Sequence, residues 1–142
     1  MPINFYTPPF YALNNFSAHA IEVDGVVYPT AEHAYQAAKL IDPAAKKAIR
    51  QARSPLLAQS LANNEHKTSR DPSWSDKKLS EMERILRIKL TQHPEVRKAL
   101  LATGTEEIVE DSPTDYFWGE GKDGSGENHI GKLWMKLRRE LS

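Results

Sequence analysis

Pairs of a capping residue and a proline divide the middle of this sequence into short helices. Asp42-Pro43 and Ser54-Pro55 each place a capping side chain directly before a proline. Proline is accommodated in the first turn of a helix but not in its interior, so each pair marks a helix start. These pairs predict helices over residues 43–52 and 55–63. A chain punctuated in this way is expected to fold mainly into short helices.

Four longer segments complete the helical pattern. Thr30, Ser75 and Asn128 are good N-cap residues, and each precedes a run with apolar positions at helical spacing. We predict helices from Thr30 to about Ile41, from Ser75 to Gln92, from Pro94 to a stop at Gly104, and from Asn128 to Leu141. The inward positions of the second and last of these are Leu79, Met82, Ile85, Leu86 and Leu90, and Ile130, Leu133, Trp134, Leu137 and Leu141.

The β-structure is expected to be small. Residues 20–23 and 26–28 flank Asp24-Gly25, which is the strongest hairpin signal in the chain. Residues 3–6, 107–110 and 115–118 read as further short strands. The pattern predicts an α+β protein that is predominantly α-helical, with one domain over residues 1–142 and a small β element.

Composition excludes several classes of function. Lysine plus arginine equals aspartate plus glutamate, 19 each, so no global charge favours non-specific binding to nucleic acid. The chain has no cysteine, which excludes disulfides and thiolate nucleophiles. No two of its five histidines stand at metal-binding spacing, so we predict no metal. A basic, apolar leader and a long apolar run are both missing, which predicts a cytoplasmic protein outside the membrane.

One helix carries a stripe of chemically different side chains. At about 100° per residue, Glu32, Gln36 and Lys39 fall on one face of the helix that Thr30 begins. Glu32 lies in the first turn, where the helix dipole favours the carboxylate form, so we predict an ionised acid. An ionised carboxylate can activate water or stabilise a developing cation. Spacing alone favours the alternative, a solvated face of an amphipathic helix.

A glycine-rich loop precedes the last helix. Gly119, Gly121, Gly124 and Gly126 are four of the chain's seven glycines, and Asn128 follows them. Such a loop before a helix N-terminus can hold a phosphate on its backbone N–H groups. The spacing also matches a dinucleotide fingerprint, but no strand–helix–strand unit surrounds it, so that interpretation is rejected. The alternative is a flexible surface loop.

Aromatic and acidic residues near these loops have two readings each. Trp74 lies in a polar stretch, and Trp118 ends an aromatic run over residues 116–118. Each could stack on a base or pack in the core, whereas Trp134 reads as core. Asp115 could hold ribose hydroxyls, although short acids in loops more often cap turns.

Taken together, these residues resemble the NADAR family, also called YbiA-like. The similar blocks follow the whole chain in order and are Asn4-Phe5-Tyr6, Asn15-Phe16-Ser17, Asp24-Gly25, Pro29-Thr30-x-Glu32-His33, Gln36-x-x-Lys39, Arg53-Ser54-Pro55, Trp74, Met82, Lys89, Val109-Glu110, Asp115-x-x-Trp118-Gly119-x-Gly121 and Gly126-x-Asn128-x-x-Gly131-Lys132-Leu133-x-Met135-x-x-Arg138. The resemblance implies a compact, largely helical domain that cleaves N-glycosidic bonds to ribose without a redox cofactor. The substrate it implies is a ribosylamino-pyrimidine phosphate of riboflavin synthesis or ADP-ribosyl-guanine, free or within a nucleic acid.

Cleavage of an N-glycoside needs an anion near the anomeric carbon and a positioned water, which predicts roles for these residues. Glu32 would stabilise the developing cation and activate water, and Lys39 would hold a phosphate or tune Glu32, with a Schiff base on the lysine as the less favoured alternative. Substrate contacts would come from Asn15, His33, Gln36, Arg70, Trp74, Asp115, Trp118, Gly119 and Asn128. Many members carry a Gly-Arg pair where this chain reads Asn63 to Arg70, and we expect Lys67 or Arg70 to replace that basic contact to phosphate. The alternative from another class is a module that binds ADP-ribose or a nucleotide without cleaving it.

Overall fold

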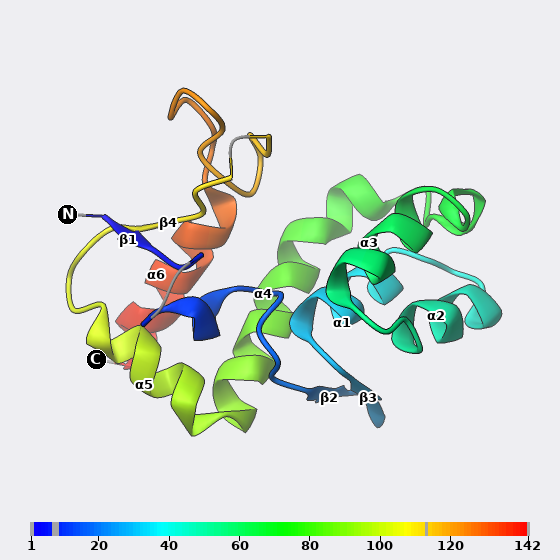
Figure 1. The fold of residues 1–142 in the computed structure, drawn as a ribbon, viewed down its shortest axis with the longest axis horizontal. Helices are drawn as coiled ribbons and strands as arrows, with labels where there is room; N and C mark the ends of the chain where they lie inside the picture. Colours follow the sequence, from blue (N-terminus) through cyan, green and yellow to red (C-terminus); the bar gives the residue numbers. More distant parts are fainter. Residues whose placement is uncertain (1, 7–8, 113, 142) are drawn as a thin grey trace. The chain divides into compact units, whose positions relative to one another are not determined.

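Helices dominate the structure, a computed structural model that describes residues 2–6, 9–112 and 114–141 (Figure 1). The chain divides into two units. One comprises Asn15–Gln92, and the other comprises Met1–Asn14 together with His93–Ser142. Among the described residues, none of the helices has the length and hydropathy of a membrane-spanning segment.

The unit Asn15–Gln92 is a hairpin followed by four helices. Helix α1 packs against α2, α3 and α4, and α4 also contacts the hairpin strand β2 (Figure 1). The elements are β2 (Ile21–Val23), β3 (Val26–Tyr28), α1 (Ala31–Ala38), α2 (Pro43–Arg50), α3 (Pro55–Asn63), the 3-10 turn η2 (Lys67–Ser69) and α4 (Trp74–Gln92).

Local capping explains why three of these helices begin where the sequence predicts. The side chain of Thr30 accepts from the His33 N–H at 3.2 Å, and Ser54 accepts from the Leu57 N–H at 3.0 Å. Asp42 caps α2 in the same way. In the hairpin turn Asp24 and Gly25 have φ of 53° and 81°, the left-handed values that a tight two-residue turn requires.

The predicted end of α1 is wrong by a few residues. The helix ends at Ala38 rather than near Ile41. Leu40 instead forms an antiparallel bridge with Arg70, and the Lys39 carbonyl accepts from the Asp71 N–H at 2.9 Å. These contacts with a distant segment draw the backbone out of the helix, and local sequence gives no sign of them.

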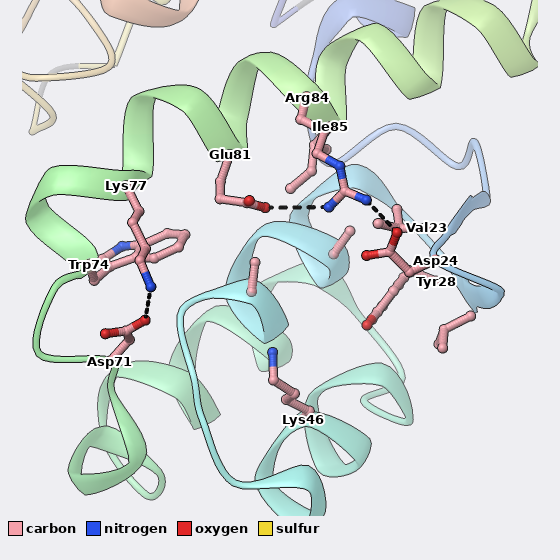
Figure 2. Close-up of a pocket in the computed structure, with 13 residues that line it drawn as sticks. Val23, Asp24, Tyr28, Lys46, Asp71, Trp74, Lys77, Glu81, Arg84 and Ile85 are labelled. Atoms are coloured by element: carbon pink, nitrogen blue, oxygen red, sulfur yellow. Dashed lines mark hydrogen bonds and ion pairs between the residues drawn. The ribbon is translucent and has the colours of Figure 1, made fainter.

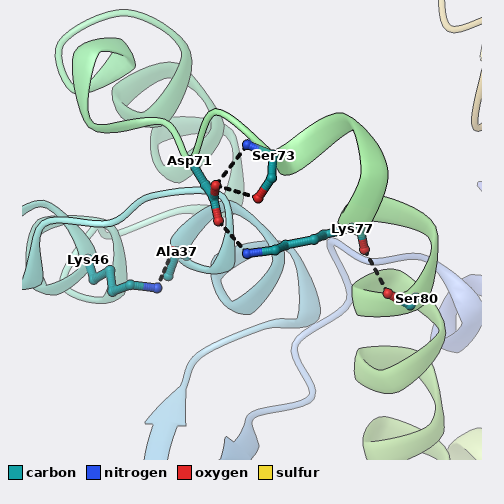
Figure 3. Close-up of polar contacts among 6 residues, drawn as sticks. All are labelled: Ala37, Lys46, Asp71, Ser73, Lys77 and Ser80. Carbon is teal, nitrogen blue, oxygen red and sulfur yellow. Dashed lines mark hydrogen bonds and ion pairs between the residues drawn. The ribbon is translucent and has the colours of Figure 1, made fainter.

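The predicted start of α4 is also wrong. The helix begins at Trp74, so Ser75 lies inside the first turn and does not cap it. The preceding turn is built by Asp71, whose Oδ1 accepts from the Ser73 N–H at 2.8 Å and from the Ser73 hydroxyl at 2.7 Å (Figure 3). The predicted inward position Leu79 is 40% exposed, whereas the other four positions of that stripe are buried.

Small side chains form the core between α1, α2 and α3. Alanines let the helix backbones approach closely, so this group of short helices buries its faces with little side-chain volume. The core cluster consists of Ala37, Leu40, Ala45, Ile49, Ala52, Ala58 and Ala62.

The other unit places one long helix against a small parallel strand pair. Ile3 and Asn4 of β1 pair with Ile108 and Val109 of β4, and α6 packs on β4 and α5. The elements are β1 (Ile3–Asn4), the 3-10 turn η1 (Tyr11–Leu13), α5 (Pro94–Ala102), β4 (Ile108–Val109) and α6 (His129–Leu141). The buried Trp134 donates from Nε1 to the Leu13 carbonyl at 3.0 Å, which confirms its prediction as core.

Two predictions in this unit are wrong. Residues 115–118 form no strand, and the bends lie at residues 116–119, because Asp115 Oδ1 accepts from the backbone N–H groups of Phe117 and Trp118. Asn128 does not cap α6 with its side chain. It has a φ of 51°, and its amide bridges the Glu110 N–H and the Ile108 carbonyl, which ties the start of α6 to β4.

Candidate functional site

The centre of the candidate site is Glu32, in the first turn of α1. Its side chain is only 6% exposed, and the Gln36 Nε2 donates to Glu32 Oε2 at 2.7 Å. The side chains of Asn15 and Gln59 also hydrogen-bond to the carboxyl group and stabilise its charged form. Glu32, Gln36 and Lys39 are therefore all buried, and the alternative of a solvated helix face is wrong.

The environment of Glu32 shifts its pKa in the direction opposite to the helix-dipole expectation. Burial raises the pKa, because an ion loses hydration in the interior. The hydrogen bond from Gln36 and the positive charge of Lys39 lower it, but the net shift is upward. Glu32 can thus exchange a proton closer to neutral pH than an ordinary glutamate, a property shared by many catalytic acids and bases.

Two amide oxygens beside Glu32 lack protein partners. Within residues 2–6, 9–112 and 114–141, the buried side-chain polar atoms without a hydrogen bond are Asn15 Oδ1 and Gln36 Oε1. A carboxylate only accepts hydrogen bonds, so each amide must turn its NH₂ group toward Glu32 and its oxygen elsewhere. Leaving such acceptors buried is unfavourable, and a water or a ligand hydroxyl would satisfy them.

Positive side chains gather at the end of α1. Lys39 is buried at the C-cap, donates from Nζ to Asn63 Oδ1 at 3.1 Å and lies 5.5 Å from the centre of the Tyr35 ring. Burial lowers the pKa of Lys39, Glu32 opposes that shift, and the charges of Arg70 and Lys78 add to it. Lys39, Arg70 and Lys78, hereafter the cationic group, suit an anion such as a phosphate.

Two residues predicted to contact the substrate, His33 and Trp74, instead pack within this unit. His33 Nδ1 is 2.8 Å from Thr30 Oγ1, and its Nε2 is 2.8 Å from the Ala52 carbonyl oxygen. Both ring nitrogens are engaged within the protein, which favours a structural role over a substrate contact. Trp74 is 2% exposed and packs on Tyr35 with a centroid distance of 5.4 Å. Its burial favours the core reading over stacking on a base.

The predicted residues of the other unit form a folded loop. Trp118 packs edge to face on Phe117, and a Cβ on Gly119 would lie 2.8 Å from the Glu110 carbonyl oxygen. The backbone N–H groups of residues 126–130 all donate to carbonyl groups of residues 116–120. These donors are therefore occupied within the loop, so a phosphate bound by Asn128 and the glycine loop would not be held by the N–H groups of residues 126–130.

The structure adds Gln59 and Lys78 to the candidate site. Gln59 hydrogen-bonds to Glu32 from α3, and the charge of Lys78 on α4 acts on Lys39. Sequence reasoning missed both, since neither belongs to a motif and both approach α1 only through helix packing.

A separate cavity of about 300 Å³ lies between the hairpin, α1 and α4 (Figure 2). Ala34 and Ala38 line it, about 200° around α1 from Glu32 and Gln36. Two ion pairs lie at its rim, Asp71–Lys77 at 2.8 Å and Arg84–Asp24, and Lys46 donates to the Ala37 carbonyl at 2.9 Å. This cavity contains none of the Glu32 chemistry, and the described residues that surround it include no metal-binding cluster.

Comparisons with known proteins cover nearly all of the chain. Residues 4–142 match the NADAR domain. The N-glycosidase YbiA of Shigella flexneri is 39% identical over 142 residues, which span 99% of this chain and 88% of that protein. An N-glycosidase of Nostoc punctiforme is 37% identical over 147 residues, covering 99% and 93%. A riboflavin biosynthesis protein of Vibrio vulnificus is 37% identical over 99% of this chain, but this match spans 38% of that protein.

A solved structure extends the likeness to three dimensions. The NMR structure of the Escherichia coli protein YbiA matches with a TM-score of 0.88 and 38% sequence identity, over 99% of this chain and 84% of that one. The match confirms the predicted YbiA-like, mostly helical fold.

Proposed function

The chain belongs to the NADAR family, whose similar members include N-glycosidases, and we propose that it hydrolyses the N-glycosidic bond between a phosphate-bearing ribose and a nitrogenous base. The base is the pyrimidine of a riboflavin-pathway ribosylamino-pyrimidine phosphate or the guanine of ADP-ribosyl-guanine. The observation that carries the proposal is the buried Glu32 carboxyl group, held by amides and placed beside the cationic group. The relative named for riboflavin biosynthesis supports the first substrate.

Glu32 suits the demands of this reaction. Cleavage of an N-glycoside develops positive charge at the anomeric carbon, and a carboxylate in a low-dielectric site stabilises that charge strongly. A water oxygen bonds to this carbon while the bond from carbon to the base nitrogen breaks. Glu32 takes one proton from the water, and the departing nitrogen takes up one proton from solvent. Glu32 then returns its proton to solvent, so the net reaction adds one water across the bond. The raised pKa of Glu32 makes its carboxylate a stronger base.

The amides beside Glu32 would position the other reactants. Gln36 holds the carboxylate with an N–H group at 2.7 Å, and Asn15 stabilises it more weakly. Each of these side chains keeps a buried oxygen as an acceptor. Water and the ribose hydroxyls are donors that can satisfy these oxygens. In this arrangement the side chains of Asn15 and Gln36 orient both the Glu32 carboxylate and the water or hydroxyl group from which it takes a proton.

The cationic group would bind the phosphate. Lys39 also interacts with Glu32 through its charge, which lowers the pKa of the carboxyl group. Lys39 therefore has two roles in the proposal, a contact to the anion and a control on the basicity of Glu32. Arg70, which is exposed, would replace the basic contact that many relatives place in a Gly-Arg pair.

The test uses both substrates in parallel. Purified protein is incubated with ribosylamino-pyrimidine phosphate or with ADP-ribosyl-guanine, and the free base is followed by chromatography while binding is measured by calorimetry. The proposal predicts release of the base from at least one substrate. Binding without release would contradict it and would favour a non-enzymatic module that reads ADP-ribose or a nucleotide.

A further inference from the structure

Lys89 is a buried lysine that the proposed reaction does not use. It lies in the last turns of α4, its side chain is fully buried, and its Nζ donates to Ser17 Oγ at 2.7 Å. Ser17 Oγ in turn lies 2.8 Å from His19 Nδ1. Burial lowers the pKa of Lys89 to about 7. A methionine of similar length would avoid this desolvation, so packing alone does not explain a lysine here.

The partner of Lys89 belongs to the segment that supports the candidate site. Asn15, two residues before Ser17, accepts from the Glu32 N–H at 3.1 Å through its backbone carbonyl. The Asn15 amide also contacts Met82 Sδ at 3.4 Å. Met82 and Lys89 are seven residues apart, about two helical turns, so they lie on the same face of α4. Helix α4 therefore holds the segment Asn15–Ser17 at both of its ends.

We propose that Lys89 is a positioning residue that acts through Ser17 to hold Asn15 against Glu32. The hydrogen bond from Lys89 to Ser17 fixes one end of the segment, and Asn15 at the other end contacts both the backbone and the carboxyl group of Glu32. The Asn15 amide lowers the pKa of Glu32. Loosening the segment would therefore raise that pKa, and it would also remove a constraint on the start of α1. The effect on catalysis rests on the proposed function, whereas the effect on Asn15 does not.

The experiment combines Lys89→Met, Ser17→Ala and the double variant. Each single change is expected to reduce kcat about tenfold, because the variants loosen Asn15 and misplace Glu32. The double variant should be about as active as either single one, since both changes break the same link. The rise of activity with pH should move to higher pH in all three. Lys47→Met, the same change at an exposed lysine of α2, is the control.

A second readout needs no substrate. NMR follows the Asn15 side-chain amide and the hydrogen exchange of the Glu32 N–H, which should shift and accelerate in both single variants but not in Lys47→Met. If Lys89→Met does not fold, Ser17→Ala alone decides the question by both readouts. Unchanged kcat and unchanged Asn15 and Glu32 signals in a folded variant would overturn the positioning role. Changed signals in a protein whose wild type releases no base would refute the proposed function and leave the positioning role standing.

Discussion

At the scale of single residues, the candidate site depends on how amides share a buried carboxyl group. Gln36 donates to Glu32 at 2.7 Å, yet its own oxygen is left without a protein partner. An unsatisfied buried oxygen destabilises the folded state, so the arrangement makes sense if water or a substrate hydroxyl completes it. The two unsatisfied amide oxygens therefore destabilise the folded state, but they are ready to accept hydrogen bonds from a ligand. Functional sites often lower stability in this way.

Gln36→Leu tests this arrangement. The change removes a donor that lowers the pKa of Glu32 and an acceptor for the incoming hydroxyl group. Because the proposed reaction uses Glu32 as a carboxylate, the rise of kcat with pH should move to higher pH, and kcat at neutral pH should fall about tenfold. The measurement is a pH–rate profile of base release, with Gln51→Leu at an exposed position as the control. An unchanged profile would exclude the contact from catalysis.

At the scale of helices and strands, local capping predicts where an element starts better than where it ends. Ser54-Pro55 sets the first residue of α3, and Asp24-Gly25 sets the hairpin, because each signal acts through its own backbone. The end of α1 could not be predicted, since it depends on the pairing of Leu40 with Arg70, thirty residues away. Asparagine is a common N-cap residue, but the Asn128 side chain instead hydrogen-bonds to the backbone of β4 and of Glu110.

Removal of one cap gives a prediction at this scale. Ser54→Ala loses the hydrogen bond from the Leu57 N–H and should lower the free energy of unfolding by about 1 kcal/mol. Urea denaturation followed by circular dichroism measures the change. Ser60→Ala, at an exposed position inside the same helix, should change stability by less than about 0.5 kcal/mol. Equal effects of the two changes would show that the cap does not stabilise α3.

At the scale of the whole molecule, the fold class could be predicted from sequence, and the site only in part. Glu32, Gln36 and Lys39 share a helix face because of their spacing, so sequence brings them together. Gln59 and Lys78 reach this face only through the packing of α3 and α4. Burial also reverses the expected pKa shift of Glu32, because desolvation depends on every element packed around the carboxyl group.

The buried Lys89 predicts how global stability depends on pH. Its pKa falls from 10.5 to about 7 on folding, so between these values the unfolded chain binds a proton that the folded chain does not. The free energy of unfolding should therefore rise with pH across this interval. Denaturation midpoints from pH 7 to 10 measure the slope, which Lys89→Met should reduce and Lys47→Met should preserve. Equal slopes in wild type and Lys89→Met would contradict the shift.

The central claim is that the buried Glu32 carboxylate drives hydrolysis of the N-glycosidic bond. Glu32→Gln keeps the size of the side chain and removes its charge, and Glu65→Gln makes the same change at an exposed position. The direct measurement is kcat for release of the base by the two purified variants and the wild type. The account predicts a loss of about a hundredfold or more in Glu32→Gln and none in Glu65→Gln. A folded Glu32→Gln variant that releases base at the wild-type rate would contradict it.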